Sequence, residues 1–267
     1  MEIKTEQDMI EFCKQAKGPF SISIDSPLNN FEERVWQDKN DEMIKLGKIG
    51  KSSHLQQGIL KINYWRSVYL TEFTEAPLLY PSQKILIENP KLTGPLTGNL
   101  SNCFDPETDR FLFHMRRQNI SAPFGFQAAA AGMSRFREHP YTTAKKELAE
   151  EAGIEYPLSP FQNRAIDVLP FMKAGKVPQL LFSFGFLNDL SEFPVCRSLD
   201  DIAKFESRTK QALAEGREPH REAYPFTVHY ASVEGIAGEL NDKRRFYGPI
   251  YQSTINFIGA LRDAGYL

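Results

Sequence analysis

One stretch of the sequence decides the fold: Gly132-Met-Ser-Arg-Phe-Arg-Glu138-His-Pro-Tyr-Thr-Thr-Ala-Lys-Lys146-Glu147-Leu-Ala-Glu150-Glu151-Ala-Gly153-Ile154. We expect a helix from Pro140 to Ala152, because proline suits the first helical position and no residue between them breaks a helix. Gly153 suits the left-handed residue that follows a helix end. His139 would then be the N-cap, although histidine is not among the preferred capping residues.

The two faces of this helix differ in chemistry. At about 100° per residue, one apolar stripe forms that we expect to face the core: Tyr141, Ala144, Leu148 and Ala152. A second face, which we call the acidic face, carries Glu147, Glu150 and Glu151. Three neighbouring carboxylates repel each other unless a cation lies among them, and their oxygens suit Mg²⁺ or Mn²⁺. Taken alone, such a run is more often a solvated surface that lysines partly neutralise.

The spacing of the whole stretch resembles the signature box of the Nudix hydrolases, Gly-x5-Glu-x7-Arg-Glu-U-x-Glu-Glu-x-Gly-U, in which U is aliphatic. The positions that agree are Gly132, Glu138, Glu147, Leu148, Glu150, Glu151, Gly153 and Ile154, and Lys146 replaces the arginine. This segment, the Nudix box, covers 23 of the 267 residues. The resemblance implies an α+β protein with the Nudix fold, an α/β/α sandwich with a mixed β-sheet in which the box forms a loop-helix-loop.

The resemblance also implies roles for the glutamates. Glu147, Glu150 and Glu151 would bind the divalent metal and act in catalysis. The position of Glu138 supports the metal site in some members of the family and is mainly structural in others. Lys146 keeps the positive charge of the missing arginine but lacks its rigid bidentate fork. Many members carry a Pro-Gly-Gly turn before the box, where this chain reads Phe124-Gly-Phe-Gln-Ala-Ala-Ala-Ala-Gly132. These two departures keep open a second reading, a Nudix-like module that binds a nucleotide sugar without cleaving it.

We expect two parts in the chain, an N-terminal α/β extension over residues 1–80 and a Nudix hydrolase domain over residues 81–267. The extension should hold a helix over 8–17, a strand over 20–25 and a helical segment over 30–46. The composition of residues 58–70 favours a strand, with a short helix as the alternative. A turn-rich stretch from Pro81 that includes Gly94, Pro95 and Gly98 should separate strands over 84–88 and 110–115. Asp105 to Asp109 should form a turn.

Beyond the box we expect strands over 165–171, 179–186 and 226–232, and helices over 199–216 and 247–267. The strand over 110–115 resembles the family strand that ends in an arginine near the substrate, so Arg116 and Arg117 are candidate diphosphate contacts. Many Nudix enzymes take their catalytic base from a loop in the region of Glu218 and Glu222, with Glu206 as a weaker candidate. The histidines show no metal-ligand spacing.

The composition is that of an ordinary soluble globular protein, with a formal net charge of -2 and 25% charged residues. No basic domain indicates a nucleic-acid partner, and no apolar run is long enough for a membrane span. The three cysteines are far apart and outside zinc-ligand patterns, which favours free thiols and a cytoplasmic location. A homodimer is left open.

Together these features predict a Mg²⁺- or Mn²⁺-dependent pyrophosphatase that acts on a small-molecule nucleoside diphosphate derivative. Pro170 follows the box at about the distance at which a proline marks relatives that act on ADP-ribose, and the run from Gly58 to Arg117 faintly resembles the extension of UDP-glucose pyrophosphatases. Both observations favour a nucleotide sugar.

Overall fold

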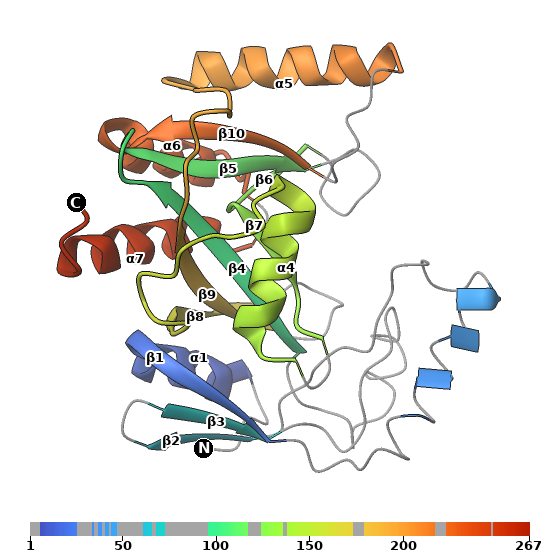
Figure 1. The fold of residues 1–267 in the computed structure, drawn as a ribbon, viewed down its shortest axis with the longest axis vertical. Helices are drawn as coiled ribbons and strands as arrows, with labels where there is room; N and C mark the ends of the chain where they lie inside the picture. Colours follow the sequence, from blue (N-terminus) through green and yellow to red (C-terminus); the bar gives the residue numbers. More distant parts are fainter. Residues whose placement is uncertain are drawn as a thin grey trace. The chain divides into compact units, whose positions relative to one another are not determined.

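The computed structural model describes residues 6–25, 61–65, 68–72, 96–116, 124–135, 138–172, 179–216, 223–246 and 248–267, with scattered residues between 34 and 46. Helices and strands are mixed along the chain, and both parallel and antiparallel strand pairs occur, which confirms the α+β class (Figure 1). The chain divides into two compact units. The first comprises Met1–Asn99, Gly132–Thr143 and Asp167–Phe182, and the second Leu100–Ala131, Ala144–Ile166 and Ser183–Leu267.

The first unit contains the predicted N-terminal helix and strand. Its elements are α1 (Glu6–Gln15), β1 (Lys17–Asp25), β2 (Lys61–Trp65) and β3 (Val68–Glu72), with strand order β1-β3-β2. Strand β1 is parallel to β3, whereas β2 is antiparallel to it. Helix α1 buries Met9, Phe12 and Ala16, which lie at helical spacing. The strand favoured over 58–70 is confirmed where the structure describes this stretch, in β2 and in the first part of β3.

The strands that belong wholly or in part to the second unit follow the order β10-β5-β4-β9-β8, with β6 beside β5 and β7 beside β4. Their bounds are Leu96–Asp105 (β4), Arg110–Arg116 (β5), Phe126–Gln127 (β6), Ala130–Met133 (β7), Ala165–Phe171 (β8), Gln179–Leu187 (β9) and Ala223–His229 (β10). The predicted strands over 110–115, 165–171 and 179–186 are confirmed, as is the turn at Asp105–Asp109. The strand expected over 84–88, the helical segment over 30–46 except for scattered residues, and the predicted domain boundary at residue 80 lie outside the described residues.

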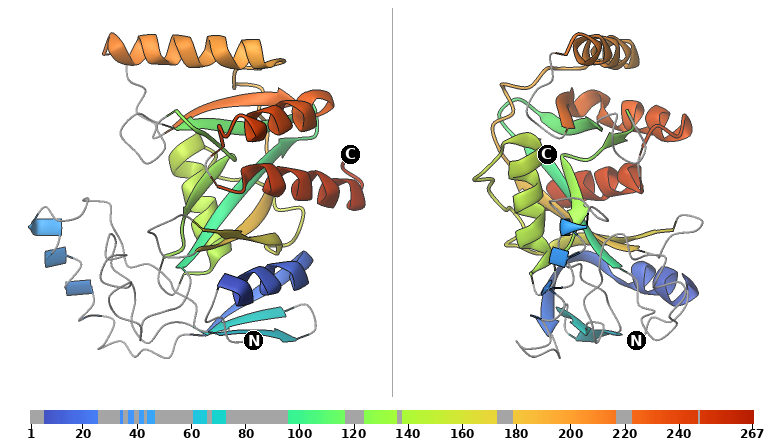
Figure 2. Two further views of the ribbon diagram at one scale, coloured as in Figure 1. Left: turned by 180° about the vertical axis from the view of Figure 1, so that it is seen from behind. Right: turned by 90° about the vertical axis from the view of Figure 1, so that its right-hand side faces the viewer.

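Strand β4 has helices on both faces. Successive residues of a strand point to opposite faces, and two neighbours show this directly. The Ser101 hydroxyl donates to the carbonyl of Ala144 in α4 (Pro140–Ala152), 3.0 Å away. The Asn102 amide donates to the hydroxyl of Ser253 in α7 (Ile250–Asp263), 2.9 Å away. Figure 2 shows α4 on one side of the strands and α7 with α6 (Tyr230–Asp242) on the other.

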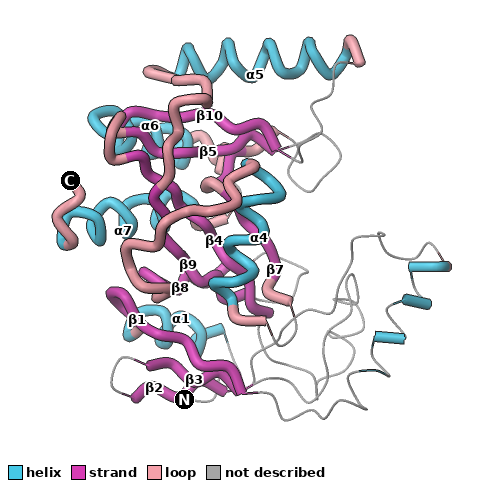
Figure 3. The backbone as a smooth tube through the Cα atoms, viewed as in Figure 1, coloured by secondary structure: helices cyan, strands magenta, loops and turns pink. Residues whose placement is uncertain are grey.

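Aromatic side chains fill the core on the α7 side. The ring of Phe111 lies 4.7 Å from that of Phe104 and 5.8 Å from that of Phe257, and all three residues are almost fully buried. Helix α5 (Leu199–Ala214) lies beside β10 (Figure 3), where Phe205 and Phe226 have ring centroids 5.3 Å apart. Ring pairs in this range contribute both buried area and favourable geometry.

Two expectations about element bounds are wrong. Gly98 lies inside β4 rather than in a turn, and a Cβ there would come within 2.6 Å of Leu181 Cδ2, so close packing explains the glycine. The strand expected over 226–232 ends at His229, where α6 begins. The helices predicted over 199–216 and 247–267 are confirmed with shorter bounds. In the described part of the chain, no helix combines the length and apolarity needed to cross a membrane.

Candidate metal and diphosphate site

Helix α4 forms with the predicted bounds and with a terminating signal at each end. At its start, Nδ1 of His139 accepts a hydrogen bond from the backbone N–H of Tyr141 at 3.1 Å, so the imidazole acts as the N-cap. At its end, Gly153 has φ 75° and its N–H donates to the carbonyl of Ala149 at 2.9 Å, as in an αL cap. The helix inside the Nudix box is therefore fixed by local chemistry.

The apolar stripe of α4 is buried as expected. Ala144, Leu148 and Ala152 have no exposed surface, and Tyr141 is half-buried. This burial fixes the rotation of the helix about its axis and so decides where the acidic face lies. On that face, Glu150 is exposed, Glu147 is half-buried and Glu151 is buried.

Glu151 is the member of the acidic face whose position the structure explains best. Its Oε2 atom accepts hydrogen bonds from Nε2 of Gln127 at 2.8 Å and from the backbone N–H of Ala131 at 3.1 Å. Both donors lie in the segment between Phe124 and Gly132, where many Nudix hydrolases carry Pro-Gly-Gly. These contacts use only one oxygen, which leaves Oε1 as the atom that can meet a ligand. The segment therefore orients Glu151 through two donor residues, neither of which is a glycine.

Gln127 also connects Glu151 to Arg116. The Oε1 atom of Gln127 accepts a hydrogen bond from Nη1 of Arg116 at 2.7 Å, so the amide lies between a guanidinium and a carboxylate. This geometry follows from strand pairing, because β6 is antiparallel to β5 and places Gln127 opposite His114. Hydrogen bonds to charged partners are stronger than neutral ones, so this chain of contacts holds Glu151 in one orientation.

His114 lies next to the same carboxylate. Its ring is fully buried, and Nδ1 is 3.8 Å from Oε2 of Glu151, which is beyond hydrogen-bond distance. Within the described residues neither ring nitrogen has a hydrogen-bond partner. The spacing of the histidines gives no reason to single out His114, and Gln127 was not among the predicted site residues. The signal that was available is a lone amide in the otherwise apolar run 124–132.

Glu138 makes a contact of a different kind. Its Oε2 atom accepts a hydrogen bond from the hydroxyl of Thr143 at 2.8 Å, and Thr143 is fully buried in the first turns of α4. A carboxylate near a helix N-terminus also interacts favourably with the helix dipole. This contact accounts for a structural role of Glu138.

The structure describes only some of the remaining predicted site residues. Arg116 ends β5, whereas Arg117, Glu218 and Glu222 lie outside the described residues. Glu206 lies on α5 and forms ion pairs with Lys210 and Arg245, each at 2.7 Å. Burial acts to raise the pKa of Glu206, but the hydrogen bonds from those two cations outweigh it and lower the pKa below its usual range. A carboxyl group with a lowered pKa is a weak proton acceptor, which argues against Glu206 as a general base.

The oxygen donors of the acidic face fit Mg²⁺, which needs only one or two protein carboxylates and takes its other ligands from water and phosphate. Among the residues that the structure describes, no three His, Cys, Asp or Glu side chains converge as a complete protein-only metal cage would require. The metal site therefore stays a prediction that rests on the Nudix box. Comparison of the chain with models of known protein families gave no match, and comparison with characterised proteins gave none either.

Proposed function

We propose that this chain is a Mg²⁺- or Mn²⁺-dependent Nudix hydrolase. Its substrate would be a nucleoside diphosphate linked to another group, a nucleotide sugar of the ADP-ribose or UDP-sugar type. The observation that carries this proposal is the agreement between the Nudix box and helix α4, which begins at Pro140, ends at Ala152 and is followed by Gly153 with a positive φ.

Each residue of the proposed site would have its own role in binding or hydrolysis. Glu147, Glu150 and Oε1 of Glu151 would hold two or three divalent cations between them, with one or two carboxylates for each, and Gln127 would keep the Glu151 carboxylate in position. A bound cation of this kind neutralises diphosphate charge and lowers the pKa of an attacking water. Arg116, at the end of β5 beside Gln127, would contact the diphosphate through its guanidinium. Glu218 or Glu222 would accept the proton of the attacking water.

A second function, binding of a nucleotide sugar without hydrolysis, is favoured by a separate observation. The segment before the box reads Gln127 followed by alanines, where many Nudix hydrolases carry Pro-Gly-Gly. Lys146 also lacks the fork with which an arginine holds a neighbouring glutamate. A protein with these features would bind the diphosphate but would position the cation less well for attack.

Release of nucleoside monophosphate separates the two functions. The full-length chain is incubated with Mg²⁺ and with ADP-ribose, UDP-glucose or a dinucleoside polyphosphate, and the products are resolved by anion-exchange chromatography. Hydrolysis should require Mg²⁺ and should fall by roughly a hundredfold or more in Glu150→Gln and Glu151→Gln, because each removes a ligand charge needed in the transition state. Glu155→Gln, in an exposed residue just after the box, is the matched control and should keep full activity. Tight binding of one substrate with no turnover of any would support the binding module instead.

A further inference from the structure

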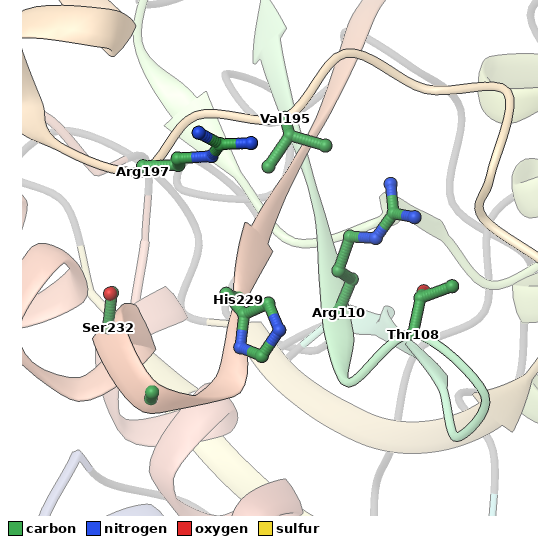
Figure 4. Close-up of a pocket in the computed structure, with 7 residues that line it drawn as sticks. Thr108, Arg110, Val195, Arg197, His229 and Ser232 are labelled. Atoms are coloured by element: carbon green, nitrogen blue, oxygen red, sulfur yellow. The ribbon is translucent and has the colours of Figure 1, made fainter.

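A pocket of about 430 Å³ lies at the other end of β5 from Arg116, within the second unit. Figure 4 shows its lining, which comprises Thr108, Arg110, Val195, Arg197, His229, Ala231 and Ser232. Arg110 begins β5 and Arg116 ends it, so at about 3.3 Å per residue the two arginines are roughly 20 Å apart along the strand. The pocket is therefore separate from the residues that position Glu151.

The pocket brings together positive charge from separate segments. Arg110 comes from β5 and Arg197 from the segment before α5, and the guanidinium groups of both lie at its border (Figure 4). None of its lining residues is acidic, although the carboxylate of Asp189, outside the lining, interacts electrostatically with Arg110. Arginine stays protonated in proteins, and its planar fork matches the oxygens of phosphate. Two such groups facing one cavity of this size are suited to a small anionic ligand.

The first turn of α6 adds partial positive charge to the same cavity. Ala231 and Ser232 are in this turn, and His229, the N-cap, makes no side-chain capping bond. The N–H groups of Ala231 and Ser232 have no partner within the first turn of a helix and can donate to an anion, and the helix dipole favours negative charge there. Val195, with 38% of its surface exposed, provides an apolar wall beside these polar groups.

Backbone hydrogen bonds hold the walls of the pocket in place. The N–H of Tyr230 donates to the carbonyl of Asp109 at 2.7 Å, which ties the start of α6 to the turn before β5. The segment before Arg197 is tied to β10 in the same way, with the N–H of Thr227 bonded to Pro194 at 2.7 Å and the N–H of Cys196 bonded to Thr227 at 2.8 Å. Pairing of β10 with β5 sets His229 opposite Arg110. The backbone of the pocket walls is thus in place before a ligand arrives, so that binding has to order only the side chains.

We propose that this pocket binds the phosphate group of a small phosphorylated molecule. The two guanidinium groups and the N–H groups of α6 would surround a phosphate dianion, while Val195 and Ala231 would contact the organic part. A monocarboxylate could use only one arginine fork and would bind more weakly. The site does not depend on the acidic face of α4 or on a divalent cation. This proposal is therefore independent of the proposed hydrolase activity.

The test is calorimetric titration of the full-length chain with inorganic phosphate, glucose 6-phosphate and acetate, in EDTA and at constant ionic strength. We expect both phosphates to bind and acetate to bind at least tenfold more weakly. Arg197→Gln and Arg110→Gln should each weaken phosphate binding by about tenfold or more, which is the effect of losing one charge-assisted contact. Arg208→Gln, in an exposed arginine of α5 outside the pocket, is the matched control and should bind as the parent does.

The amide NMR signals of the same chain locate the site. Phosphate should shift the signals of Ala231 and Ser232 in the parent and in Arg208→Gln, but not in Arg197→Gln at the same concentration. A urea midpoint equal to that of the parent shows that each variant is folded. The proposal is overturned by absence of phosphate binding to the parent, by equal affinity in all three variants, by acetate binding as tightly as phosphate, or by shifts confined to α4.

Discussion

The most informative stability test is the replacement of Gln127 by alanine. The Gln127 side chain is 1% exposed and makes two hydrogen bonds to charged partners, one from Arg116 at 2.7 Å and one to Glu151 at 2.8 Å. Each bond of this type contributes about 1.5 to 3 kcal/mol. Because 12% of the Glu151 side chain is exposed, water can replace part of the lost interaction. We therefore expect about 1.5 kcal/mol from each bond, so the loss of both should lower the free energy of unfolding by about 3 kcal/mol.

Urea unfolding, followed by circular dichroism, measures this change. Gln252→Ala is the matched control, because Gln252 makes one exposed bond to Asn256 on α7, and it should cost less than about 0.5 kcal/mol. A double-mutant cycle with Glu151→Ala then isolates the pair, and we expect a coupling free energy of about 2 kcal/mol between Gln127 and Glu151. The reasoning is refuted if Gln127→Ala costs no more than Gln252→Ala, or if the two changes are additive.

Three further predictions concern the rest of the second unit. Burial acts to raise the pKa of Asp105, but hydrogen bonds from Thr108 and from backbone N–H groups outweigh it and lower the pKa. Since the folded pKa lies below the unfolded one, this stabilisation is present at neutral pH and is lost as the pH falls through the folded pKa. In urea unfolding, Asp105→Asn should therefore lower the free energy of unfolding by about 2 kcal/mol at pH 7 and by less in acid. Gly185→Ala should lower stability by about 1 to 3 kcal/mol in the same assay, because its Cβ would overlap the ring of Phe257. Burial raises the pKa of the Cys196 thiol to about 11, so at pH 8 iodoacetamide should label it roughly a hundredfold more slowly in the native than in the unfolded chain, as followed by mass spectrometry.

Each of these predictions has an internal control. Asp263→Asn changes an exposed carboxyl group on α7 and should change the free energy of unfolding by less than about 0.5 kcal/mol at pH 7. Gly259→Ala places a methyl group in open space on the same helix and should stabilise it by about 0.5 to 1 kcal/mol. Equal costs for Gly185→Ala and Gly259→Ala, a pH-independent Asp105→Asn, or labelling of native Cys196 at the unfolded rate would each contradict the corresponding argument.

The elements that sequence reasoning placed correctly are those with local signals. Helix α4 carries Pro140 at its start and Gly153 after its end, and its apolar stripe shows the helical period. Helix α6 was missed because His229 gives no capping signal and Thr227 and Val228 continue the pattern of a strand. In such cases the distant contacts of the folded chain, not the local sequence, decide where an element ends.

Strand β4 shows the same limit for a buried element. Its sequence, LTGNLSNCFD, is too polar to indicate a central strand. The polar side chains are tolerated because they find distant partners, as Asn102 does 151 residues away at Ser253. The site follows this rule as well. The acidic face could be predicted from spacing, whereas the contact between Glu151 and Gln127 depends on how β6 pairs with β5.

The central claim is that the acidic face of α4 binds a divalent cation, and titration with Mn²⁺ followed by electron paramagnetic resonance tests it without requiring turnover. The free Mn²⁺ signal should decrease as the parent chain or the control Glu155→Gln is added, because bound Mn²⁺ gives a weak, broadened spectrum. Glu147→Gln and Glu150→Gln should each weaken binding by about tenfold or more, since each removes one carboxylate ligand. A Mn²⁺ affinity that is the same in all four proteins, or no binding to the parent, would contradict the account.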